Sequence, residues 1–241
     1  MGFFADGGAA LQFSERKPLK EKTDEKEEKS GEPESETGGY PRRLAVFSTK
    51  TSQQMRRIAS ETALDEVMPW HWEKGVSYHC FSSGDVDALT YLKHAIRQQP
   101  LDYAYLSTWC MANADIDEIA DWMRKGLLKR IDFYVGEIFN ARYSLEYGML
   151  LDLCKKFPAC RVAIFRNHAK IIGGIGEKFA FVTESSANVN TNPRSEQTTV
   201  TVDEGLFYFY KDIFDQITTF DRTQRQDQRE RWKPWQADNR N

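Results

Sequence analysis

Residues 161–188 have the sequence RVAIFRNHAKIIGGIGEKFAFVTESSAN. It contains three runs rich in β-branched and aromatic residues, RVAIF (161–165), HAKII (168–172) and KFAFVT (178–183), and such runs are typical of strands. The last two flank the glycines of GGIG (173–176), a composition that favours the turn of a β-hairpin. We therefore predict three strands in close succession, with the second and third joined by a turn at these glycines.

Outside this stretch, short β-rich runs alternate with amphipathic helical segments. Strands are expected at 43–48, 76–81, 103–109, 130–138 and 198–202, and helices at 51–67, 85–99, 113–125, 143–157 and 206–220. Ser83 is the expected N-cap of the helix at 85–99. This order predicts an α/β fold in which a mixed β-sheet is flanked by helices on both faces.

The charge of the chain is concentrated in one short segment. The formal net charge is −3, and residues 15–36 alone hold 9 acidic and 6 basic side chains with almost no apolar ones. Such a composition cannot bury enough apolar surface to fold. We expect a disordered charged tail at 1–42, one folded domain at 43–220, and a polar, mildly basic and solvated C-terminal tail at 221–241.

Several functional classes are disfavoured by what the sequence lacks. No run of 18 apolar residues occurs, so no stable membrane insertion is expected, and we predict a cytoplasmic protein. The four cysteines form neither a C-x-x-C pair nor a disulfide framework, and neither a metal nor a cofactor is expected. GGIGEK lacks the spacing of a P-loop, and no G-x-S-x-G of a serine hydrolase occurs.

Two pairs of polar residues stand out in the stretch 161–188. His168 and Lys170 lie two apart on a predicted strand, so both side chains should leave the same face of the sheet. Ser186 and Asn188 lie two apart just after the next strand, beside the first pair. An ammonium, a hydroxyl and a carboxamide can hold a phosphate diester while an imidazole attacks it. Arg194, in a loop expected at the mouth of this site, could contact a flanking phosphate.

These residues also resemble a known motif. The run from His168 to Glu196 is similar to the phospholipase D superfamily, whose motif is H-x-K, four residues, Asp, six residues, then G-S-x-N, with a later carboxylate. His168 and Lys170 match H-x-K, Ser186 and Asn188 match S-x-N, and Glu196 matches the carboxylate that orients the histidine in this family. The resemblance implies one half of the family's fold over 43–220 and a metal-independent phosphodiesterase that forms a phosphohistidine.

The sequence departs from this motif in two places. Ile175 stands at the position of the family's Asp, and Ser186 follows His168 by 18 residues where the motif has 15. An elongated hairpin would absorb the extra residues, and Glu177 within it is a candidate to stand near the position of the missing Asp.

A single H-x-K has a consequence for assembly. The family uses a second histidine to protonate the leaving oxygen, so the resemblance implies a homodimer in which two copies of His168 face each other. Nucleic acid is the expected substrate, with Arg142, Arg166 and the C-terminal segment from Arg222 to Trp235 as further candidates to contact it. Two alternatives stay open: a catalytically weak or inactive module of the same fold that binds nucleic acid or phosphate, and a strand on which His168 and Lys170 are only solvent-facing. The other three histidines are assigned to packing.

Overall fold

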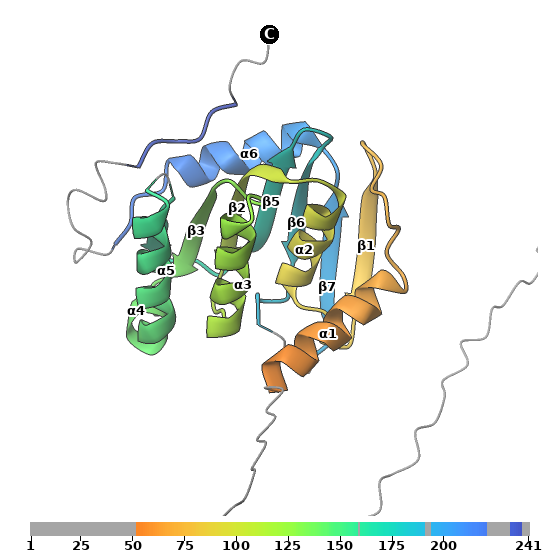
Figure 1. The fold of residues 1–241 in the computed structure, drawn as a ribbon, viewed down its shortest axis with the longest axis horizontal. Helices are drawn as coiled ribbons and strands as arrows, with labels where there is room; N and C mark the ends of the chain where they lie inside the picture. The colour runs from red at the N-terminus through yellow and green to blue at the C-terminus, as the bar shows by residue number, and fades with distance from the viewer. Residues whose placement is uncertain (1–51, 159, 191–193, 221–231, 238–241) are drawn as a thin grey trace, which may run out of the picture. The chain divides into compact units, whose positions relative to one another are not determined.

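The computed structural model describes residues 52–158, 160–190, 194–220 and 232–237, and Figure 1 shows their arrangement. The strand expected at 43–48 and the tail expected at 1–42 lie outside these residues, as does most of 221–241. The elements are α1 (Ser52–Asp65), β1 (Ser77–Ser82), α2 (Ala88–Gln98), β2 (Leu101–Thr108), α3 (Asn113–Arg124), β3 (Ile131–Gly136), α4 (Phe139–Arg142), α5 (Ser144–Lys156), β4 (Val162–Phe165), β5 (Lys170–Gly176), β6 (Ala180–Ser185), β7 (Glu196–Thr201) and α6 (Glu204–Asp215).

The strands form one mixed sheet in the order β1-β7-β6-β5-β2-β3-β4. β2, β3 and β4 are mutually parallel, whereas β5 is antiparallel to both β2 and β6, and β7 is antiparallel to both β6 and β1. The carboxyl ends of β1, β2, β3, β4 and β6 therefore meet the amino ends of β5 and β7 at one end of the sheet. We call this the lower end, after its place in Figure 1, and the opposite one the upper end.

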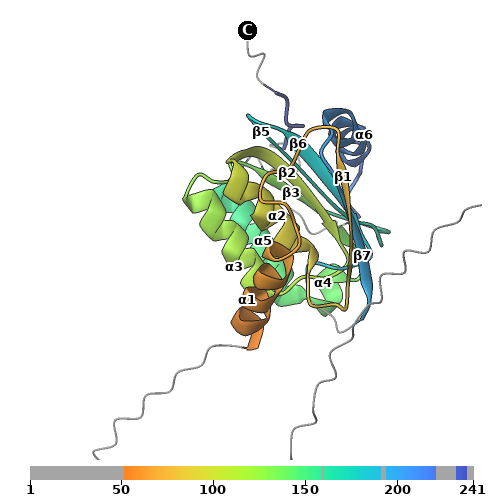
Figure 2. The ribbon, with the colours of Figure 1, turned by 90° about the vertical axis from the view of Figure 1, so that its right-hand side faces the viewer.

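Helices cover both faces of the sheet, as the sequence predicted. Figure 2 shows α1, α2, α3 and α5 on one face and α6 on the other. The first face holds the larger core, which is mostly aliphatic, and the second holds an aromatic core around Tyr103, Tyr105, Tyr134, Phe207 and Phe214. Burial of these side chains is the main source of the fold's stability. Within the described residues, no helix is both long and apolar enough to cross a membrane.

The turn predicted at GGIG is wrong, because these glycines lie inside β5. A Cβ on Gly173 would lie 2.0 Å from Cζ of Tyr105, and one on Gly174 would lie 2.6 Å from Cε1 of Phe181. The glycines thus allow aromatic rings from the two neighbouring strands to lie against the backbone of β5. The connection to β6 instead follows Gly176, whose N–H donates to the carbonyl of Phe179 at 3.1 Å.

The start of α2 also differs from the prediction. Asp87, not Ser83, is the N-cap, and its carboxylate accepts a hydrogen bond from the backbone N–H of Thr90 at 3.0 Å. Arg57 of α1 forms ion pairs with Asp87 and, at the start of α3, with Asp115. This single guanidinium ties α1 to the amino ends of α2 and α3, which both lie at the lower end of the sheet.

Candidate active site

His168 precedes β5 instead of lying on it, which corrects the prediction that His168 and Lys170 share a strand. Lys170 is the first residue of β5, and its Nζ lies 2.9 Å from Nδ1 of His168 and 2.8 Å from the His168 carbonyl oxygen. The two side chains are therefore in direct contact, closer than neighbours on one strand face would be. The imidazole is exposed at the lower end of the sheet, while Lys170 is half-buried.

The loop that carries His168 is held by its neighbour Asn167, which is buried. The Asn167 amide donates to Oγ of Ser107 at 2.8 Å and to the Tyr134 carbonyl at 2.9 Å, and its oxygen accepts from the Ala169 N–H at 2.9 Å. Ser107 in turn donates to the Ala169 carbonyl at 3.0 Å. The backbone on both sides of His168 is thus tied to β2 and β3, which limits where the imidazole can point.

Trp109, directly after β2, packs against the imidazole. The ring centres of Trp109 and His168 are 5.6 Å apart with planes inclined by 50°. The indole fits there because Gly136 has no side chain: a Cβ at Gly136 would lie 2.6 Å from Cδ1 of Trp109. One wall of the site is therefore aromatic, and it is built from the carboxyl ends of β2 and β3.

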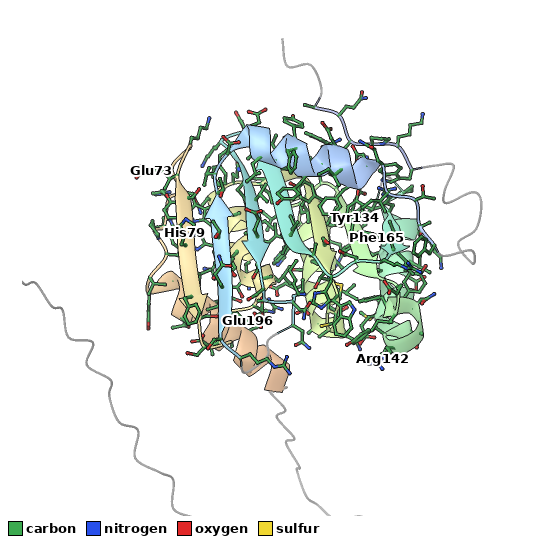
Figure 3. All side chains as sticks on the ribbon, turned by 180° about the vertical axis from the view of Figure 1, so that it is seen from behind. Glu73, His79, Tyr134, Arg142, Phe165 and Glu196 are labelled. Carbon is green, nitrogen blue, oxygen red and sulfur yellow. The ribbon has the colours of Figure 1, made fainter. Side chains whose placement is uncertain are left out.

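Ser186 and Glu196 come together beside this pair. The ladder between β5 and β6 places Lys170 opposite Ser185, so Ser186 lies next to the start of β5. The Ser186 hydroxyl donates to the carboxylate of Glu196, and it accepts the N–H of Gln197 at 2.9 Å. Figure 3 shows Glu196 at the start of β7, at the lower end of the sheet. Within the described part of the chain, no hydrogen bond or ion pair joins Glu196 to His168.

Asn188 is fixed by its backbone. Its carbonyl accepts from the N–H of Ala88 at the start of α2, at 3.3 Å, and the next residue, Val189, donates to Oγ1 of Thr108 at 3.3 Å. The side-chain oxygen of Asn188 is buried and has no hydrogen-bond partner. A buried amide oxygen without a partner is unusual, and it leaves this side chain able to accept a donor from a bound molecule.

Burial lowers the pKa of Lys170 from 10.5, although the nearby Glu196 and the thiol of Cys110 act in the opposite direction. Cys110 itself has a pKa raised by burial, so its thiol is neutral at pH 7. The ammonium of Lys170 is therefore partly shielded from water and lies near one carboxylate, that of Glu196. Such a cation interacts strongly with an added anion because little water screens it.

Other residues named from the sequence lie elsewhere. Ile175 points into the aromatic core, and Glu177 follows β5 at the upper end of the sheet, about 20 Å along the strand from Lys170. Glu177 therefore does not contact Lys170 or His168. Arg194 is exposed two residues before β7, and no contact among the described residues joins it to the other candidates. Arg142 and Arg166 are exposed as well, and Figure 3 places Arg142 toward the lower end.

The remaining histidines do not contact His168. His94 is buried on α2, where its Nε2 lies 3.1 Å from the carbonyl oxygen of Pro69. His79 is exposed on β1, contrary to the expected packing within an apolar strand, and lies beside Thr199. His71 is exposed as well. In the residues that the structure describes, no three His, Cys, Asp or Glu side chains are grouped so that they could hold a metal ion.

Asn167 and Trp109 were missed by sequence reasoning. Asn167 is adjacent to His168 in the sequence, but its role depends on Ser107 and Tyr134, which are more than 30 residues away. The sequence places Trp109 at the end of a predicted strand, and its large aromatic side chain is the only feature that indicates a contact surface. The sequence did carry a signal in both cases. Asn167 is a polar residue next to the histidine, and Trp109 is a large aromatic residue at the end of a buried strand.

Comparisons with known proteins were made at the levels of sequence and structure. No family model and no curated protein matches the sequence. Solved structures that are similar include polyphosphate kinase from Porphyromonas gingivalis (13% identity, TM-score 0.44), NucT from Helicobacter pylori (17%, 0.43) and phosphatidylserine synthase from Haemophilus influenzae (14%, 0.40). Each covers 58% of this chain, and the matched part spans 25%, 94% and 37% of those proteins, respectively.

These three proteins are members of the phospholipase D superfamily, the family that the motif around His168 resembles. The chain spans only a quarter of the length of the polyphosphate kinase and about a third of the synthase. The TM-scores lie below 0.5, and such weak similarity gives no support for a function. A function for this protein must therefore be argued from its own residues.

Proposed function

We propose that this protein is a metal-independent phosphodiesterase, a nuclease in which His168 is the nucleophile. The observation that carries the proposal is the contact between the exposed imidazole of His168 and the half-buried ammonium of Lys170. Ser186 directly follows the neighbouring strand β6, and Glu196 begins β7, the next strand beyond β6. A nucleophile, a cation for the phosphate oxygens, a hydroxyl donor and a carboxylate are thus available at one end of the sheet.

Lys170 must change partners for the reaction to begin. In the structure, Lys170 donates to Nδ1, so the proton of a neutral imidazole is on Nε2 and that nitrogen cannot attack. A bound phosphate offers Lys170 a stronger, charged acceptor. When Lys170 moves to the phosphate, Nδ1 is free to carry the proton, and the Nε2 lone pair can attack phosphorus. Glu196 accepts the hydrogen bond from Nδ1–H once Ser186 turns its hydroxyl toward the phosphate.

The reaction then takes two steps. The Nε2–P bond forms as the bond from phosphorus to the leaving oxygen breaks, and that oxygen takes a proton from an acid. Water next attacks the phosphohistidine, the N–P bond breaks, and the released phosphate monoester keeps the water's oxygen. The ammonium of Lys170 and the side-chain N–H groups of Asn188 donate to the phosphate oxygens through both steps.

The acid that protonates the leaving oxygen is proposed to come from a second copy of the chain. None of the chain's other three histidines contacts His168, and His168 itself is exposed at the lower end. Two copies related by a two-fold axis through this end would bring two imidazoles together. One would act as nucleophile while the other, protonated, would act as acid.

The dimer is tested by sedimentation and by the dependence of specific activity on protein concentration. If the site is shared, sedimentation should give a dimer, and specific activity should fall on dilution below its dissociation constant. A monomer with full specific activity at every concentration would contradict the shared site.

Nucleic acid is proposed as the substrate because exposed arginines lie near the exposed His168. Arg166 follows β4, Arg142 ends α4 and Arg194 precedes β7, so cations flank the candidate site on both sides. Trp109 adds an aromatic surface beside His168 on which an unpaired base can stack.

The activity is tested in excess EDTA with single-stranded DNA, duplex DNA, RNA, bis(p-nitrophenyl) phosphate and phosphatidylcholine vesicles as separate substrates. We expect hydrolysis of the chromogenic diester and of at least one nucleic acid, unchanged by EDTA. Binding of DNA without turnover of any diester would favour the alternative, a phosphate-binding module of the same fold. Hydrolysis of the vesicles alone would keep the chemistry and exclude nucleic acid.

The pH dependence of activity should report on Lys170. Since burial lowers the pKa of Lys170 from 10.5, the charge is present at lower pH and is lost as pH rises through a value below 10.5. We expect kcat/KM of the wild type to fall there, and Lys170→Arg, slower at all pH values, to lack this decline because arginine stays charged. The same alkaline decline in both proteins would show that another group causes it.

Asn167 is expected to act by positioning His168. Asn167→Ala removes three hydrogen bonds from the His168 loop and should lower kcat by about 10- to 100-fold with little change in KM, as small displacements of a reacting group do. Asn140→Ala, at an exposed position of α4, is the matched control and should keep wild-type kinetics. Equal kinetics of the two variants would contradict the positioning role.

A further inference from the structure

The face of the sheet that α6 covers carries a buried charged cluster that the proposed reaction does not use. Asp132, with none of its surface exposed, accepts the Tyr103 hydroxyl at 2.9 Å, the Arg130 guanidinium at 3.0 Å and the backbone N–H of Arg161 at 3.1 Å. Arg130 and Arg161 directly precede β3 and β4. The cluster therefore lies at the upper end of the sheet, opposite His168.

A short segment near the carboxyl terminus lies on this cluster. Residues 232–237 contain no helix or strand, and within them Trp232 and Trp235 are half-buried while the other four residues are exposed. The indole N–H of Trp232 donates to Asp132 at 3.2 Å, and the Arg161 guanidinium lies 3.6 Å from the centre of the Trp232 ring. Asp132 thus binds the N–H of the Trp232 indole, and Arg161 contacts the face of the same ring.

The next residues of the segment make two further contacts. The Lys233 carbonyl accepts a hydrogen bond from Arg130 at 2.6 Å, while the Lys233 side chain and Pro234 are exposed. Trp235 stacks on Tyr103 with ring centres 5.1 Å apart and planes inclined by only 8°. The surface thus binds two indoles that are three residues apart and one carbonyl between them. Pro234 restricts the conformation of the backbone that joins the two indoles.

The surface continues beyond the segment. A cavity of about 690 Å³ adjoins it and is lined by Trp235, Arg130, Tyr208, Lys178 and Glu177, among others. The segment is therefore seated along one side of a larger groove. Contacts made through two aromatic anchors and one carbonyl, with the intervening side chains exposed, are typical of a bound peptide.

From these contacts we propose that the upper end of the sheet is a binding site for a peptide of the form Trp-Xaa-Pro-Trp. Residues 232–235 occupy the site within their own chain. The same segment supplied from another molecule binds there when the chain's own segment is removed from it. This site is separate from the reaction at His168 and does not depend on it.

The first test vacates the site in the full-length chain by Trp232→Ala with Trp235→Ala. A fluorescently labelled peptide of residues 231–237 (RWKPWQA) should bind this variant, and the wild type, whose site is occupied, should bind it at least about tenfold more weakly. A peptide with either Trp replaced by Ala should lose at least about tenfold in affinity. Failure of the folded variant to bind the wild-type peptide would overturn the proposal.

The second test applies if the protein with Trp232→Ala and Trp235→Ala does not fold. A protease site placed within residues 221–231 of the otherwise unchanged full-length protein allows the segment to be cut from the folded chain. We expect the labelled peptide to displace the cut segment while circular dichroism stays native. If the cut segment does not exchange, or if the protein unfolds as it leaves, residues 232–235 are part of the core and no peptide site exists.

Discussion

Replacing His168 by alanine is expected to lower the rate of diester hydrolysis in EDTA by at least about 10⁴-fold, to the limit of detection. The reason is that the other nucleophilic groups described near Lys170 are neutral: the Ser186 hydroxyl donates its proton to Glu196, and burial raises the pKa of the Cys110 thiol. The exposed position of His168 means that the variant should fold normally. The measurement is the initial rate of bis(p-nitrophenyl) phosphate hydrolysis.

His79→Ala is the matched control for this variant. His79 is also exposed, but it lies on β1 beside Thr199, away from Lys170. We expect its rate to equal that of the wild type. A rate for His168→Ala within about tenfold of that control would exclude His168 as the nucleophile, since losing a nucleophile costs far more.

Replacing Asp132 by alanine should cause the largest loss of stability among single substitutions in the sheet. The change leaves the guanidinium of Arg130, the Tyr103 hydroxyl and the Trp232 indole without their buried acceptor. Removing one partner from a buried ion pair typically costs about 3–5 kcal/mol, because the remaining charge stays dehydrated. Urea unfolding followed by far-ultraviolet circular dichroism measures this difference in the free energy of unfolding.

A partly exposed aspartate, Asp121, provides the comparison for Asp132. Asp121 forms an ion pair with Lys125 on the surface of α3. Asp121→Ala should leave the urea midpoint nearly unchanged because exposed ion pairs add little to stability. Equal midpoints for Asp132→Ala and Asp121→Ala would show that the buried cluster does not stabilise the fold.

The part of the site that lies on neighbouring strands could be predicted from the sequence. The β-rich runs around Ile172 and Val182 define β5 and β6, and their pairing brings Lys170 next to Ser185 and Ser186. Pairing between consecutive strands is local, so composition and spacing are enough to predict it. The mixed sheet with helices on both faces followed in the same way from the alternation of strands and helices.

The misplaced turn has a different origin. Glycines in a short apolar stretch favour a turn when only neighbours in the sequence are considered. In the fold, Gly173 lies under the ring of Tyr105, which is 68 residues earlier in the chain and reaches it only through the pairing of β2 with β5. The requirement for glycine there comes from tertiary packing, which a single sequence does not reveal.

The same limit applies to Asn167 and to residues 232–237. The side chain of Asn167 has a role only because β2 and β3 end beside it. Trp232 and Trp235 stand in a polar stretch whose composition favours a solvated tail, yet Asp132 and Tyr103 bind their indoles. In both cases the contacts join segments that are far apart in the sequence, so they become visible only in the folded chain.

The role of His168 as nucleophile can be tested by trapping the covalent intermediate. A single turnover in EDTA is stopped with alkali, which preserves phosphohistidine, and the digested protein is examined by mass spectrometry. We expect His168 in the wild type and in His79→Ala to carry an adduct made of the phosphorus and its remaining ester group, and we expect no adduct in His168→Ala. Product formation at the wild-type rate by His168→Ala, or an adduct on another residue, would contradict this role.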